Sequence, residues 1–204
     1  MRRVLLAVLL VPIVAASVAT AAPDTRVAIP TADASIAVPA TWKALNARTV
    51  ANSAAMNRLI AQNPSLRPFL AQLQSAGSPV KLMAFDLNAA RQFATNVNVV
   101  VAPASPGLTL PQLAAAYEPQ LRRLLPSLRG GISSRIVALP ATRALRASYR
   151  IGFSTSGRTL TVQTLQYIVL RRGKSIVITL STLPGQSASR RATFTAIARS
   201  LRFG

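Results

Sequence analysis

Apolar and polar residues alternate most clearly in the third quarter of the chain. From Leu145 to Phe153 every second residue is apolar and the residues between them are basic or small, which is typical of a half-buried strand. Similar runs, joined by turn residues, predict three neighbouring strands at 132–139, 159–170 and 175–183. Short turns between consecutive strands favour an antiparallel meander.

The first half of the chain mixes short strands with helices. Strands are predicted at 26–30, 35–39, 80–87 and 97–102, and helical patterns at 50–62, 63–77, 110–124 and 187–201. Pro119 is expected to kink or divide the third helix, and Ser187 or Ser189 to cap the last one. The fold class is therefore α+β, a predominantly antiparallel sheet with helices packed on its faces. One core is expected to contain Trp42, Leu70, Tyr149, Phe153, Ile178 and Phe194.

The N-terminus has the pattern of a signal peptide. Arg2 and Arg3 precede an apolar run from Val4 to Val18, and Ala19-Thr20-Ala21 has the small residues that signal peptidase recognises. The alternative, an uncleaved membrane anchor, would need about 20 apolar residues, more than this run offers. We expect a cleaved signal peptide at 1–21, an extended leader at 22–33 and a single domain at 34–204. The product would be exported, extracellular or periplasmic, without a membrane span.

The composition excludes most catalytic chemistry. The chain has no histidine and no cysteine, so His-based triads, Cys-His pairs and the usual zinc sites are absent, as is a lipoprotein anchor. Its four carboxylates, Asp24, Asp33, Asp86 and Glu118, are scattered along the sequence. We therefore expect no enzyme activity, no cofactor and no metal site.

One motif resembles a catalytic one. Residues Ser78 to Lys81 match the Ser-x-x-Lys pattern of serine acyl-enzymes, which requires a helix. Here the following residues favour a strand, and the partner motifs of that class are missing. A strand is the preferred interpretation.

The net charge of +20 is the strongest functional signal. Clustered cations attract anionic partners. The candidate anion-binding residues are Arg122, Arg123, Arg129, Arg171, Arg172, Lys174, Arg190 and Arg191. Two structural explanations compete with this one: GC-rich codons favour arginine, and cations at a helix C-terminus stabilise the helix dipole. If the charge is functional, these residues should converge on one face.

The chain resembles the PsbP-like superfamily, the α/β/α fold of an extrinsic photosystem II subunit and of a nuclear-transport Ran-binding protein, and most of all its exported bacterial LpqN-type branch. The matching segments are 38–42, 139–144, 166–170, 173–174, 178–180 and 194–203. The resemblance covers about 34–203 and implies a non-enzymatic binding or assembly factor.

Two functions remain open at this point. The first is a binding or assembly module of the cell envelope that acts through protein surfaces. The alternative is an electrostatic binder of anionic envelope polymers, lipid headgroups or nucleic acid through arginine clusters. Specific nucleic-acid recognition is not expected, because the few aromatic residues fall at core positions and do not interleave with these arginines.

Overall fold

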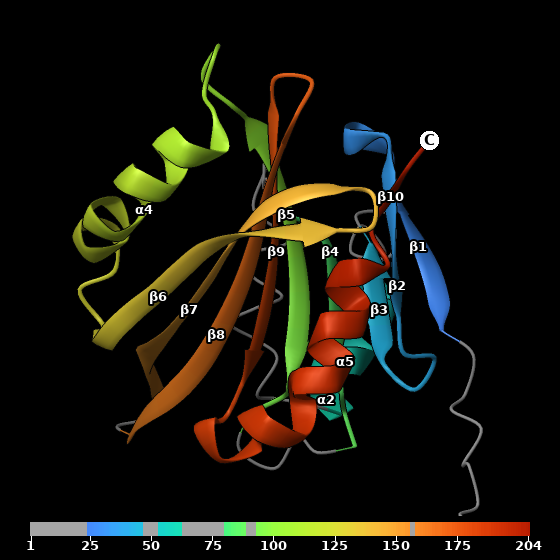
Figure 1. Cartoon of the computed structure of the whole chain (residues 1–204). Coiled ribbons are helices and arrows are strands. Elements are labelled where there is room, and N and C mark those ends of the chain that lie inside the picture. Colours follow the sequence, from blue (N-terminus) through green and yellow to red (C-terminus); the bar gives the residue numbers. More distant parts are fainter. Residues whose placement is uncertain (1–23, 47–52, 63–79, 89–92, 156–157) are drawn as a thin grey trace, which may run out of the picture.

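The computed structural model describes residues 24–46, 53–62, 80–88, 93–155 and 158–204. Seven strands form one antiparallel sheet in the order β3-β4-β5-β9-β8-β7-β6 (Figure 1). Its strands are β3 (Lys43–Asn46), β4 (Val80–Phe85), β5 (Asn96–Pro103), β6 (Leu128–Leu139), β7 (Thr142–Thr155), β8 (Arg158–Arg171) and β9 (Lys174–Thr182). The predicted meander is thus confirmed as β6 to β9.

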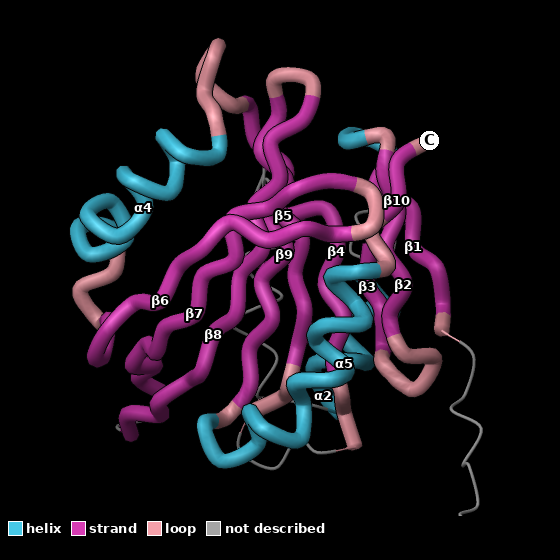
Figure 2. The backbone as a smooth tube through the Cα atoms, viewed as in Figure 1, coloured by secondary structure: helices cyan, strands magenta, loops and turns pink. Residues whose placement is uncertain are grey.

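A second, three-stranded sheet has the order β1-β2-β10. Its strands are β1 (Thr25–Ile29), β2 (Ala34–Val38) and β10 (Arg202–Phe203). Strand β1 comes from the segment expected to be a leader and pairs along its whole length with β2. Because β10 also pairs with β2, the two ends of the described fold meet in one sheet (Figure 2).

The helices are α2 (Ser53–Gln62), α4 (Leu110–Leu124) and α5 (Ser187–Arg199), with short 3-10 turns η1 (Pro30–Ala32) and η3 (Pro184–Gln186). Helix α4 continues through Pro119 without being divided. Neither predicted serine caps α5: Ser187 and Ser189 donate instead to the carbonyl oxygens of Pro184 and Gln186. The turn η3 leads directly into α5, so no separate cap is formed. The helix expected at 63–77 lies outside the described residues.

The expected single core is divided into two clusters by the large sheet. Trp42, Ile178 and Phe194 are buried together where α5 and the small sheet cover one face. Tyr149 lies in the other cluster, with Tyr117 of α4. Alternation along β7 predicted that Tyr149 is buried, but it did not say on which face. Leu70 and the side chain of Phe153 lie outside the described part of the structure.

No helix among the described residues is long and apolar enough to cross a membrane.

Candidate anion-binding groove

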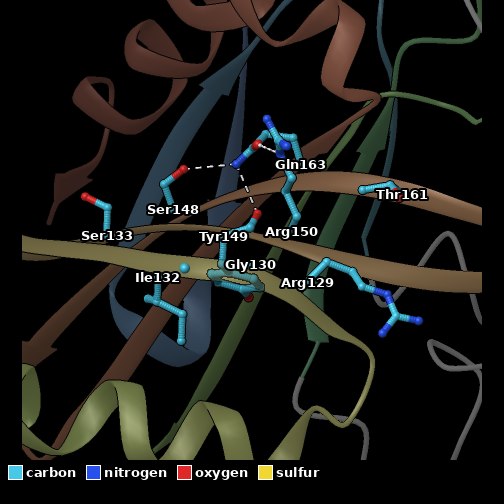
Figure 3. Close-up of a pocket in the computed structure, with 10 residues that line it drawn as sticks. Arg129, Gly130, Ile132, Ser133, Ser148, Tyr149, Arg150, Thr161 and Gln163 are labelled. Atoms are coloured by element: carbon cyan, nitrogen blue, oxygen red, sulfur yellow. Dashed lines mark hydrogen bonds between the residues drawn. The ribbon is translucent and has the colours of Figure 1, made fainter.

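Strand β6 departs from regular pairing with β7 at two glycines. Arg129 pairs with Arg150 and Ser133 with Ser148, so β6 has two more residues than β7 between these pairs. Gly130 within this bulge has a φ of 69°, a backbone conformation that glycine adopts without strain. The bulge borders a hollow of about 650 Å³ that extends to Gln163 on β8 (Figure 3).

A second hollow, of about 200 Å³, continues from the first. Ser148 and Gln163 line both, so the two form one groove across β6, β7 and β8 to α5. We call this the arginine groove. It is defined by Arg129, Arg146, Arg150 and Arg191, together with Ser133, Ser148 and Gln163.

The register of β6 and β7 places like charges opposite each other. Arg129 pairs with Arg150 and Arg135 pairs with Arg146, while Ser133 and Ser148 pair between them. Residues that are directly opposite in an antiparallel pair share a face of the sheet, and like charges there are destabilising. One face of this ribbon therefore reads as an arginine pair, a serine pair and a second arginine pair.

Hydrogen bonds hold the middle of the arginine groove. The Gln163 side chain accepts from Arg150 Nε at 3.1 Å, and its amide donates to Ser148 Oγ and to the Tyr149 carbonyl oxygen, both at 3.0 Å (Figure 3). At the bulge, a Cβ built on Gly152 would lie 3.4 Å from Arg129 Nε, so this guanidinium lies close to bare backbone. Two arginines are thus fixed in place by neutral partners.

Helix α5 adds further positive charge at the other end of the groove. Ser187, its first residue, and Arg191 both line the smaller hollow. The N-terminal end of a helix is positive, so a cation close to it is unfavourable unless an anion is present. The first turn of α5 contains no acidic residue to offset this charge.

All four acidic residues of the chain lie elsewhere. Asp33, Asp86 and Glu118 form ion pairs with Arg172, Arg190 and Arg122 at 3.1, 2.7 and 2.8 Å. Asp24 lines a separate hollow near the C-terminal end of α5. None of the residues that line the arginine groove is acidic. The positive charge of the groove is therefore not neutralised by the chain itself.

Of the eight cations selected from the sequence, Arg129 and Arg191 line the groove. Three others are held by the ion pairs described above. Arg171 lies over the Phe203 ring, 4.0 Å from its centroid, and Lys174 donates to the carbonyl oxygen of Thr31. Arg123 is exposed in the last turn of α4.

These eight residues do not form one cluster. Arg171, Arg172 and Lys174 lie at the start of β9, whereas Arg190 and Arg191 follow its other end. A strand of this length spans roughly 25–30 Å. The 171–174 segment is occupied in tying the β8–β9 turn to the N-terminal segment and to β10, and Arg122 forms an i, i+4 pair on α4.

Sequence reasoning missed Arg146 and Arg150 as site residues. It placed them on the polar side of a half-buried strand and took that side as solvated. One signal was available: Arg146, Ser148 and Arg150 are on one face, and no acidic residue occurs in β6, β7 or β8. A charged strand face that contains only cations differs from the mixed charges of an ordinary solvated face.

Two tyrosines lie behind the groove, under α4. The Tyr117 hydroxyl donates to the side-chain oxygen of Gln166. Burial raises the pKa of Tyr149 to about 12, and burial together with the neighbouring Tyr149 raises the pKa of Tyr117 still further above its ordinary value. Both hydroxyls are protonated near neutral pH, so neither serves as a base there.

Within the described ranges, no three acidic, histidine or cysteine side chains lie close enough to hold a metal ion. Ser78 of the Ser-x-x-Lys pattern lies outside those ranges, and Lys81 is a residue of strand β4.

No protein-family model matches the chain, and no curated protein sequence is detectably similar to it. Three solved structures are similar. The cyanobacterial PsbP, CyanoP, from Synechocystis sp. PCC 6803 is 15% identical with a TM-score of 0.53, over 92% of this chain and 96% of that chain. The Saccharomyces cerevisiae Ran-binding protein Mog1p is 9% identical with a TM-score of 0.52, over 89% and 95%. LpqN of Mycobacterium tuberculosis, involved in cell envelope biogenesis, is 14% identical with a TM-score of 0.49, over 88% and 89%.

At these identities the similarity concerns the fold alone. It confirms the expected sheet with helices on its faces over most of the chain. The chain has the α+β fold of the PsbP-like proteins.

Proposed function

We propose that this chain is an exported, non-catalytic module of the cell envelope that binds an acidic partner protein through the arginine groove. The observation that carries the proposal is the separation of charges in the structure. Four arginines line one groove, while every acidic side chain of the chain lies outside it. Desolvated guanidinium groups bind carboxylates with paired hydrogen bonds, which makes such a groove a suitable receptor for acidic side chains.

Export is supported by the N-terminal pattern. Arg2 and Arg3, the apolar run and Ala19-Thr20-Ala21 are the three parts of a secretory signal, which places the mature N-terminus at Ala22. An exported protein without cysteine depends on packing for its stability, and the two buried clusters provide that packing.

A role in binding is supported by the chemistry of the groove. Its polar groups are guanidiniums, hydroxyls and one amide, none of which is a good base at neutral pH. Three of the four carboxylates are engaged by arginines, and the tyrosines under α4 have raised pKa values. These groups can hold an anion in place, but they do not supply the acid and base that hydrolysis requires.

A protein partner is favoured by the precedent of Mog1p, which shares the fold and is described as a Ran-binding protein. This support is an analogy of fold and says only that such a domain can bind proteins.

The alternative function is binding of anionic envelope polymers, lipid headgroups or nucleic acid through dispersed charge. One observation favours it: a separate hollow of about 580 Å³ is lined by Arg26, Arg199 and Arg202. In that case many arginines would contribute similarly, and no single groove would dominate binding.

The test compares charge-matched variants on a poly-L-glutamate column developed with salt. The groove variant replaces Arg129, Arg146 and Arg150 with glutamine, and the control variant replaces Arg123, Arg143 and Arg199, which are exposed outside the groove. We expect the groove variant to elute at clearly lower salt than the control, because it loses a localised site in addition to charge. Equal shifts would overturn the proposal and support the dispersed alternative.

A further inference from the structure

The spacing of charges in the arginine groove restricts what shape of anion it can hold. Arg150 and Arg146 are four residues apart on β7, and Ser148 lies between them on the same face. Four residues of antiparallel strand span roughly 13–14 Å. A single phosphate or carboxylate therefore reaches only one end of the groove.

The two ends differ from the middle in charge. Each end contains an arginine pair across β6 and β7, and the middle contains Ser133, Ser148 and the amide of Gln163. Ser148 Oγ accepts from Gln163, and its own proton can be donated to a carbonyl oxygen in the groove. A uniformly charged polymer would place an anion over this neutral middle section, where no cation meets it.

An extended peptide has the matching periodicity. Side chains on one face of a strand repeat every second residue, at about 6.6–6.8 Å, so positions i and i+4 span the same distance as Arg146 and Arg150. Acidic residues at those two positions would face the two arginine pairs, and a polar residue at i+2 would face the serine pair.

We propose that the arginine groove recognises an extended acidic segment of a partner protein, with carboxylates at positions i and i+4 and a neutral polar residue between them. This rests on the proposed function, because it names the feature of the partner that the groove reads. Binding of such a segment would also neutralise the like-charge pairs Arg129–Arg150 and Arg135–Arg146.

The experiment measures affinities of the mature protein by fluorescence anisotropy for three labelled probes of equal charge. The first is a short capped serine- and threonine-rich peptide with two glutamates four residues apart. The second has the same composition with the two glutamates adjacent, and the third is a short linear polyphosphate. We expect the spaced peptide to bind about tenfold more tightly than the adjacent one, since the adjacent peptide forgoes one charge-assisted contact.

Single variants locate the effect. R150Q and R146Q should each abolish the preference for the spaced peptide, because each removes one end of the pair. R143Q, at an exposed position of β7 whose cross-strand partner is Ala138, removes the same charge and should leave the preference unchanged.

The outcomes separate the two proposals. Equal binding of the two peptides, lost in R146Q and R150Q, would overturn the spacing inference and leave the proposed function standing. Tighter, groove-dependent binding of polyphosphate would overturn the inference in favour of a phosphate polymer. Binding of no probe, or binding that no groove variant changes, would overturn the proposed function itself.

Discussion

Arg190 Nη2 lies 2.7 Å from Asp86 Oδ2, and this ion pair ties the first turn of α5 to the residue that follows β4. The Asp86 side chain is only 7% exposed, and it also accepts from the backbone amide of Asn88. A buried carboxylate that loses its cation is left uncompensated. The pair therefore matters more for folding than the exposed pairs of Arg122 and Arg172.

Replacing Arg190 with glutamine should lower the free energy of unfolding by about 1–3 kcal/mol, because Asp86 would lose its charged partner. The matched control is R191Q, which removes the same charge from the neighbouring exposed position and should change stability by less than about 0.5 kcal/mol. Urea denaturation of both variants checks this. Equal losses would mean that Asp86 does not depend on Arg190.

Phe194 should be a major stabilising residue of α5. It is 4% exposed and lies in the cluster that contains Trp42 and Ile178. Truncation to alanine should lower the unfolding free energy by about 3–5 kcal/mol, through lost burial and the cavity left behind. Leu124→Ala is the control, because Leu124 is 75% exposed. A Phe194→Ala variant that melts like the parent would contradict the docking of α5.

The like-charge pair of Arg135 and Arg146 should cost stability in the free protein. Arg135→Thr removes one charge from the pair and introduces a residue suited to strands, so it should raise the unfolding free energy by about 0.2–1 kcal/mol at low salt. The gain should shrink as salt is added, since exposed charges are screened. Arg143→Thr, opposite Ala138, is the control and should show no salt-dependent gain.

Stability should fall at alkaline pH because of the tyrosines under α4. Burial raises the pKa of Tyr149 from 10.0 to about 12, so the unfolded chain releases this proton at lower pH than the folded chain does. The contribution is fully present below about pH 10 and is lost as the pH rises through about 12. Denaturation measured across this window should show a shallower loss for Tyr149→Phe than for the parent. An unchanged slope would argue against burial of the Tyr149 hydroxyl.

The N-terminal pattern predicts the mature end of the protein. Sequencing of the secreted product should begin at Ala22 or within one or two residues of it. Recovery of a chain that still begins with Met1 from the membrane fraction would overturn export with cleavage.

The sequence by itself determined the elements that depend on local pattern. Alternation predicted β7 and the strands around it, and i, i+3, i+4 spacing predicted α4 and α5, because a strand or helix that buries one face must repeat its apolar residues with its own period. The scarcity of acidic residues was equally plain, and it implied that most arginines lack a carboxylate partner within the chain.

Only the tertiary structure decided which arginines meet. The bulge in β6 sets Arg129 opposite Arg150, and the return of α5 across the sheet brings Arg191 to the same groove. It also decided that Tyr149 packs under α4 while Phe194 packs on the other face. Alternation is local and has a period of two, so it separates two faces of a strand without saying what covers each. Register and bulges depend on hydrogen bonds between segments distant in sequence, and these form only in the folded sheet.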